Sequence, residues 1–114
     1  MEPARLAIEI DYAPATGPYA AVVSLCGEHD LATISQIANA LAPLVGDVLV
    51  DLSACEFIDS TAILTLLNKA EALKRDGHRL DLFVPAGSPL RRILEILHIR
   101  DLLQVHDRRP ESPA

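Results

Sequence analysis

The sequence contains no tryptophan, and aromatic residues make up only 4% of its 114 residues. Proteins that bind single-stranded nucleic acid stack the bases on aromatic side chains, so this composition argues against that class. Positive charge is also scarce, because 10 Lys and Arg side chains stand against 16 Asp and Glu, which gives a formal net charge of −6. Such a chain is repelled by phosphate backbones and anionic lipid surfaces unless a basic patch outweighs the rest. The pair Arg91 and Arg92 is too small for that, so we expect neither nucleic acid nor a membrane as a partner.

Cysteines and long apolar runs are few as well. Cys26 and Cys55 have neither the Cys-x-x-Cys nor the Cys/His spacing of a zinc site, and the four histidines stand far apart, so we expect no metal. The chain has no apolar run of the roughly 20 residues that a membrane span needs, and its first residues lack the basic-then-apolar order of a secretory signal. We therefore expect a cytoplasmic protein whose two thiols are reduced.

The sequence does contain enough apolar material for one core, because half of its residues are hydrophobic and its length is usual for a single domain. Strict alternation over residues 5–12 predicts a half-exposed strand, and residues 19–27 predict a second strand that pairs with it as an antiparallel hairpin. A short apolar run at 47–52 predicts a strand that is buried on both faces of a parallel sheet, and residues 79–84 predict the next strand.

Apolar residues at helical spacing predict three helices. The first follows Asp30 as its N-cap, the second follows the polar stretch 59–61 and ends at Gly77, and the third has Ser88 as its N-cap and Pro89 as its first residue. The periodicities turn ten residues inward as the predicted core: Val23, Leu25, Leu49, Leu52, Ile63, Leu66, Leu67, Leu82, Ile93 and Leu97.

The order β-β-α-β-α-β-α predicts an α/β fold, a single small domain whose mostly parallel sheet has an antiparallel N-terminal edge strand and is covered by helices. We assign this domain to residues 1–106. Residues 107–114 have no apolar periodicity and contain two prolines, so we expect a disordered C-terminal tail.

Two polar clusters follow predicted strands, and the carboxyl ends of parallel strands are where open α/β sheets place their functional groups. A right-handed β-α-β crossover would bring both clusters to one end of the molecule. The first cluster is Gly27, Glu28, His29 and Asp30, and the second is Glu56, Asp59, Ser60 and Thr61.

Several roles are open for these residues. Ser60 and Asp30 are ordinary helix N-caps by type and position, and the other acidic residues need be no more than solvated loop residues. A serine hydrolase would need a base beside Ser60, for which His29 on a predicted surface loop is the candidate. However, "IDSTA" lacks the flanking glycines of a nucleophile elbow, and no phosphate-cradling glycine-rich loop is present. We therefore expect no enzyme, no catalytic residues and no cofactor.

The run "VVSLCGEHDLATISQI" followed by "VLVDLSACEFIDSTAILTLL" resembles the STAS domain, specifically the stand-alone bacterial anti-sigma factor antagonists, over about residues 5–106. In that family one strand ends in a Gly-Glu-x-Asp turn, and a later Asp-Ser-Ser/Thr-Gly motif opens a helix. The residues that match are Gly27, Glu28 and Asp30 for the first motif, and Asp59, Ser60 and Thr61 for the second. The sequence departs from the pattern at Ala62, where Gly is usual, and at His29, where an apolar residue is common.

The resemblance implies a partner switch. The unphosphorylated protein would bind an anti-sigma factor with serine kinase activity, phosphorylation of Ser60 would end the binding, and a phosphoserine phosphatase would restore it. The partner-binding residues implied are Glu28, His29, Asp30, Glu56, Asp59, Ser60 and Thr61. The alternative is a STAS adaptor subunit of another assembly, such as a lipid-transport ATPase complex, in which Ser60 is never phosphorylated.

Overall fold

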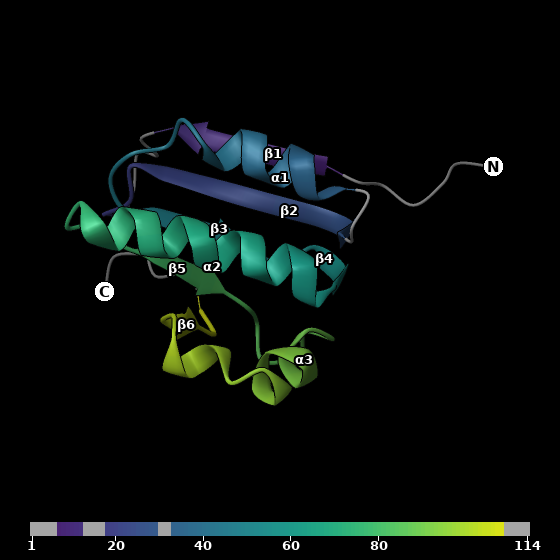
Figure 1. Ribbon diagram of the computed structural model, residues 1–114. Coiled ribbons are helices and arrows are strands. Elements are labelled where there is room, and N and C mark those ends of the chain that lie inside the picture. Colours follow the sequence, from purple (N-terminus) through teal and green to yellow (C-terminus); the bar gives the residue numbers. More distant parts are fainter. Residues whose placement is uncertain (1–6, 13–17, 30–32, 109–114) are drawn as a thin grey trace.

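The computed structural model describes residues 7–12, 18–29 and 33–108, and Figure 1 shows their arrangement. The strands are β1 (Ala7–Tyr12), β2 (Ala21–His29), β3 (Val48–Asp51), β4 (Cys55–Ile58), β5 (Leu80–Phe83) and β6 (Val105–His106). The helices are α1 (Ile34–Leu41), α2 (Ser60–Arg75) and α3 (Arg91–Ile96), and α3 is followed by the 3-10 helix η2 (Ile99–Asp101). Of the predicted tail at 107–114, residues 109–114 lie outside the described part of the chain.

The strands form one mixed sheet in the order β1-β2-β3-β5-β6, in which only the β1–β2 pairing is antiparallel. The predicted α/β fold with an antiparallel N-terminal edge is therefore confirmed. The pattern predicted no separate strand at β4, which pairs in parallel with the last residues of β2, beyond the stretch that pairs with β3. Unlike β3 and β5, which are also four residues long but buried throughout, β4 has two exposed residues at its centre and so forms no continuous buried apolar run.

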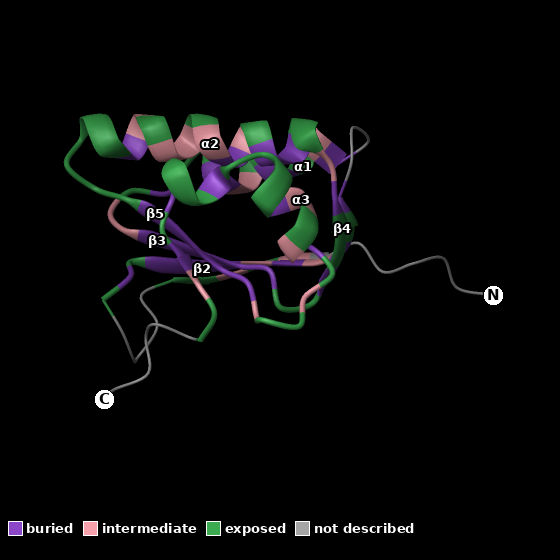
Figure 2. Cartoon of the chain, turned by 90° about the horizontal axis from the view of Figure 1, so that it is seen from below, coloured by how far each residue is buried: buried purple, intermediate pink, exposed green. Residues whose placement is uncertain are grey.

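All three helices lie on one face of the sheet, as Figure 2 shows. The main core fills the space between them and the sheet. Six of the predicted core residues belong to it: Val23, Leu25, Leu52, Ile63, Leu66 and Leu82. Leu49 is also buried but faces the opposite side of the sheet, while Leu67 and Ile93 are partly buried against the core. The prediction for Leu97 is wrong, because α3 ends at Ile96 and Leu97 is 37% exposed.

Two predicted helix starts need correction. Asp30 lies outside the described residues, and α1 begins at Ile34. Helix α3 begins at Arg91, so Ser88 is not its N-cap; the Ser88 hydroxyl oxygen instead accepts a hydrogen bond from the Leu90 N–H in the preceding turn. The difference at α3 arises because a turn precedes the regular helix, and turn residues resemble N-caps in type.

A buried carboxylate ties together the face of the sheet that the helices leave open. Asp81 is 1% exposed, and its Oδ2 accepts a hydrogen bond of 2.7 Å from the Tyr19 hydroxyl. Arg79 Nε lies 3.1 Å and His106 Nε2 3.2 Å from the same oxygen. Burial, together with the hydrogen bond and negative charge of Asp81, raises the pKa of Tyr19 to about 12. The cluster links β5 to β6 and to the segment before β2.

Leu66→Ala should lower the free energy of unfolding by about 2 to 5 kcal/mol, the range for truncating a buried leucine. Leu66 is 1% exposed, whereas Leu64 on the same helix is 55% exposed, so Leu64→Ala is the matched control and should cost less than about 1 kcal/mol. Urea unfolding of the two variants measures both values. Equal losses would contradict the assignment of the buried face of α2.

Tyr19→Phe should remove a pH dependence at alkaline pH. The folded pKa of about 12 lies above the ordinary 10, so the Tyr19 phenol contributes stability that is complete below pH 10 and is lost as the pH rises towards 12. Wild type should lose about 2 to 3 kcal/mol of its free energy of unfolding in this way, and Tyr19→Phe should not. Urea unfolding across this pH range tests it, with the exposed Tyr12→Phe as control. Parallel pH profiles for wild type and Tyr19→Phe would contradict it.

Candidate functional site

The two polar clusters meet at the carboxyl end of β2. In the parallel register Glu28 lies opposite Phe57 and His29 opposite Ile58, so β2 and β4 end side by side. The backbone N–H of Asp59 donates a hydrogen bond of 3.1 Å to the carbonyl oxygen of His29. This bond links the end of β4 directly to the end of β2. The prediction that both clusters share one end of the molecule is confirmed for the described residues. Asp30 lies outside them.

Asp59, and not Ser60, caps α2. Its backbone is extended, and its Oδ1 accepts hydrogen bonds from the Ala62 N–H at 2.9 Å and from the Thr61 hydroxyl at 2.6 Å. Ser60 is the first residue of the helix, its side chain is exposed, and its hydroxyl has no hydrogen bond within the described part of the chain. The interpretation of Ser60 as a cap is therefore wrong. Because Asp59 does the capping, the Ser60 hydroxyl is left accessible.

His29 was expected on a surface loop, and the structure corrects this. Strand β2 continues to residue 29, so Gly27 and His29 face inward while Glu28 faces solvent, and His29 is 1% exposed. Its Nε2 donates to the carbonyl oxygen of Cys26 at 3.0 Å, and its Nδ1 has no hydrogen-bond partner among the described residues. The ring is thus enclosed beneath the site. With so little of its surface exposed, the ring offers a partner almost no contact area.

The departure at Ala62 also has a structural explanation. Ala62 is 0% exposed and belongs to the main core, so its methyl group points away from the surface that a partner would cover. Replacing the family's usual glycine by alanine in the first turn of a helix favours the helix and adds nothing to the exposed surface.

The charged residues at this end of the molecule that the structure describes are acidic. Glu28 and Glu56 are exposed, and Asp59 is half-buried.

Both cysteines are free. Burial raises the pKa of the Cys55 thiol to about 11. Burial also raises the pKa of the Cys26 thiol, and the charges of Glu9 and Asp51 raise it further. Thiols with raised pKa values are poor nucleophiles at neutral pH. Among the described residues no three His, Cys, Asp or Glu side chains form a group that could hold a metal ion.

One feature beside Ser60 was not predicted from the sequence. Ser60 and Thr61 line a hollow whose other walls are aliphatic and include Leu64, Leu97 and Leu102. The available signal was Leu64, an apolar residue outside the predicted buried stripe of its helix.

No helix in the described ranges has the length and apolar character needed to cross a bilayer.

A family model described as "Mlab, STAS domain" matches residues 13–104. The structure of an anti-sigma factor antagonist from Mycobacterium paratuberculosis is similar with a TM-score of 0.76 and 19% identity, covering 91% of this chain and 87% of that one. The structure of the anti-sigma factor antagonist SpoIIAA in its unphosphorylated form is similar with a TM-score of 0.69 and 18% identity, covering 90% of each chain. The structure of the Bacillus cell fate determinant SpoIIAA in the phosphorylated form is similar with a TM-score of 0.64 and 17% identity, covering 87% of this chain and 90% of that one. No curated protein matches the chain by sequence.

Asp59→Ala should lower the free energy of unfolding by about 0.5 to 2 kcal/mol, because it removes the acceptor for the Ala62 N–H. Asp59→Asn keeps a side-chain oxygen at the cap and should cost less. Chemical denaturation gives the energies, and amide exchange at Ala62 reports the cap itself. If both variants lost the same stability, the charge of Asp59 would matter more than its capping bond.

Proposed function

The chain belongs to the STAS domain family, and we propose that it acts as an anti-sigma factor antagonist that works by partner switching. The observation that carries the proposal is the exposed hydroxyl of Ser60 at the first position of α2, directly after the Asp59 cap, with no hydrogen bond to any residue that the structure describes. Similar folds include SpoIIAA in an unphosphorylated and a phosphorylated form, which supports a serine switch on this architecture.

A phosphate on Ser60 is compatible with the folded state. It adds about −1.5 to −2 charges and three acceptor oxygens, and the N-terminus of a helix favours negative charge. The core residues of α2 lie on another face, so the added group changes the surface and leaves the packing alone. We therefore propose that phosphorylation alters binding without unfolding the protein.

The loss of binding follows from desolvation. Glu28 and Glu56 are exposed near the paired ends of β2 and β4, and Asp59 adjoins Ser60, so the phosphate joins an acidic surface. In the free protein, water and salt screen this repulsion. A partner that covers Ser60 removes that water, so the charged form binds more weakly. The proposed contact set is Glu28, Asp30, Glu56, Asp59, Ser60 and Thr61, without His29.

The partners follow from what the chain lacks. Its sequence has no phosphate-cradling glycine-rich loop, so we assign ATP binding to an anti-sigma factor with serine kinase activity. A phosphoserine phosphatase would reverse the reaction. The protein itself then acts by binding and not by catalysis, and it works in the cytoplasm, where sigma factors act.

The second candidate is a STAS adaptor subunit of another assembly, such as a lipid-transport ATPase complex. The observation in its favour is the description of the matching family model, "Mlab, STAS domain". In that role Ser60 would belong to a lasting contact surface and would stay unmodified. Phosphorylation therefore separates the two candidates.

Incubation with a cognate kinase and ATP should modify Ser60, and not Ser53, Thr61 or Thr65. The Thr61 hydroxyl is held by Asp59, and the Thr65 hydroxyl donates to the carbonyl oxygen of Thr61 at 3.0 Å inside the helix. Mass spectrometry locates the phosphate, with Ser60→Ala as control. Modification that persists in Ser60→Ala would rule the assignment out.

The affinity for the same kinase should follow the charge at position 60. Ser60→Ala should bind like the unmodified protein, Ser60→Asp should bind more weakly, and the phosphorylated protein should bind most weakly. Calorimetry gives the affinities, and circular dichroism and amide exchange show whether the fold is unchanged. Equal affinities, or altered protection of the core strands, would contradict a switch by surface electrostatics.

A further inference from the structure

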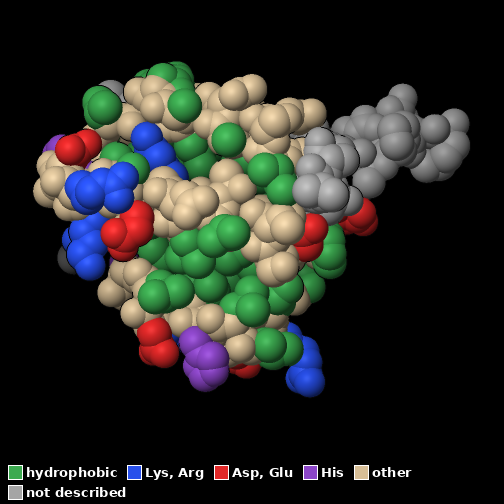
Figure 3. Space-filling model, in the orientation of Figure 1, with side chains coloured by type: hydrophobic (Ala, Val, Ile, Leu, Met, Phe, Trp, Pro, Cys, Tyr) green, Lys and Arg blue, Asp and Glu red, His purple; other side chains and the backbone are tan. Residues whose placement is uncertain are grey.

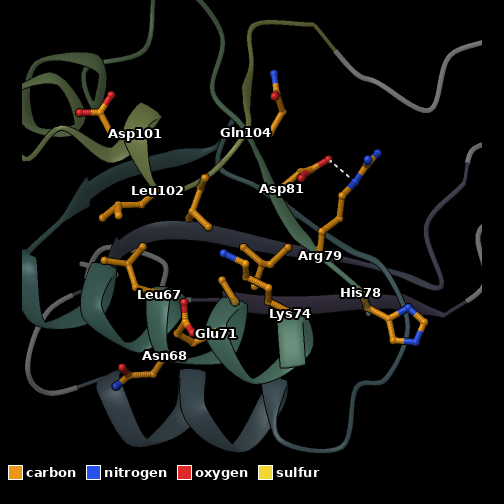
Figure 4. Close-up of a pocket in the computed structure, with 13 residues that line it drawn as sticks. Leu67, Asn68, Glu71, Lys74, His78, Arg79, Asp81, Asp101, Leu102 and Gln104 are labelled. Carbon is orange, nitrogen blue, oxygen red and sulfur yellow. Dashed lines mark ion pairs between the residues drawn. The ribbon is translucent and has the colours of Figure 1, made fainter. Parts of the chain in front are cut away.

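Two hollows lie along α2 and share two of their lining residues, Leu67 and Leu102. The hollow beside Ser60 has a volume of about 300 Å³. The other, of about 520 Å³, extends towards the end of α2 and is shown in Figure 4, with Leu67 and Leu102 near one end and Lys74 and Arg79 near the other. We call the two together the α2 groove. One wall is α2, and the facing wall comes from Leu97 and the segment 99–104.

The half of the groove beside Ser60 is aliphatic and open to solvent. Leu64, Leu97 and Leu102 are 55%, 37% and 62% exposed, and hydrophobic side chains gather beside α2 on the face shown in Figure 3. Exposed apolar residues are ordinary when scattered singly, but a contiguous patch marks a surface that interacts with another molecule. These three residues come from separate segments of the chain and line the same hollow.

The other half of the groove carries charge of both signs. Glu71 and Lys74 line it from α2, and Arg79, which pairs with Asp81, lines it from the start of β5. The groove follows α2 from Ser60 to Lys74, within a helix of 16 residues that is roughly 24 Å long at 1.5 Å per residue. The groove is therefore apolar in the half beside Ser60 and charged in the half near Lys74.

We propose that the anti-sigma factor docks an amphipathic helix into the α2 groove, an inference that rests on the proposed function. Ser60 and Thr61 themselves line the aliphatic half, so a partner that covers Ser60 necessarily reaches Leu64 and Leu97. An extended peptide has no strand edge to join in the aliphatic half, because the residues that line that half belong to α2 and to the segment 97–102, and none of them lies in a strand. A helix whose apolar side chains recur every three or four residues matches such a groove.

The groove also accounts for how one phosphate can end the binding. A phosphate on Ser60 stands at the rim of the aliphatic half, where an inserted apolar side chain would exclude the water that hydrates it. The charged half lies near the far end of α2, away from Ser60, so its role is to fix the direction in which the helix docks on the unphosphorylated protein.

The test uses histidine-kinase-like anti-sigma factors encoded in the same genome as probes, each loaded with ADP. Calorimetry measures Kd for the Ser60→Ala protein, which cannot be phosphorylated, and for the same protein with Leu64→Ser, Leu102→Ser or Val45→Ser. Val45 is 75% exposed and lies outside the groove, so it is the matched control. Leu64→Ser and Leu102→Ser should each raise Kd about tenfold or more, and Val45→Ser should change it by less than about twofold.

Thermal unfolding confirms that each variant is folded, as expected for residues this exposed. Unchanged affinity in both groove variants, with phosphorylation of wild-type Ser60 still weakening binding, would overturn the groove and leave the proposed function standing. Failure of every probe to bind or phosphorylate the wild type would overturn both. Self-association of the free protein that Leu64→Ser abolishes would assign the groove to a second copy and would also overturn the proposal.

Discussion

The parallel pairing of β4 with the end of β2 is the constraint on which the site depends. It brings the Asp59 N–H to the His29 carbonyl oxygen, and this hydrogen bond fixes where α2 begins. Because Asp59 is held from the strand side by its backbone, its side chain can turn to the helix and accept from Ala62 and Thr61. The exposed position of Ser60 follows from these two sets of bonds, one to the sheet and one to the helix.

The buried ring of His29 supports the same junction from below. A carbonyl oxygen can only accept, so Nε2 of the His29 ring donates in the contact with Cys26. Gly27, at a φ of 85°, lies between these two residues where the β2–β4 register shifts, and the left-handed backbone there costs glycine little. The matched motif thus contains two kinds of residue, those that shape the end of the strand and those, such as Glu28, that face solvent.

The sequence predicted most of the fold because a long periodic helix and short, continuously apolar strands make up its core. The buried stripe of α2 and the apolar runs of β3 and β5 are dictated by burial alone, and they lie where the pattern placed them. The errors fall where tertiary contacts outweigh local pattern. His29 was assigned to a loop because polar residues usually leave strands, and Leu97 to the core because the helical period was extended one residue past Ile96.

The candidate site was only partly predictable for the same reason. The identities of Asp59, Ser60 and Thr61 indicated a helix start, but three residues that can all cap a helix do not reveal which one does. That choice depends on the backbone bond from β2, which is a long-range contact. The α2 groove was even harder to predict from the sequence, because Leu64, Leu97 and Leu102 become neighbours only when η2 folds back towards α2.

In the proposed function, helix α2 contributes to stability with one face and to recognition with another. Ala62, Ile63, Leu66 and Leu73 hold it on the sheet, while Ser60 and Leu64 remain on the surface. A charge added at Ser60 therefore meets solvent in the free protein and does not enter the core, so the cost of that charge arises chiefly when a partner excludes the solvent. A binding surface built in this way can be altered by one phosphate while the domain that carries it stays folded.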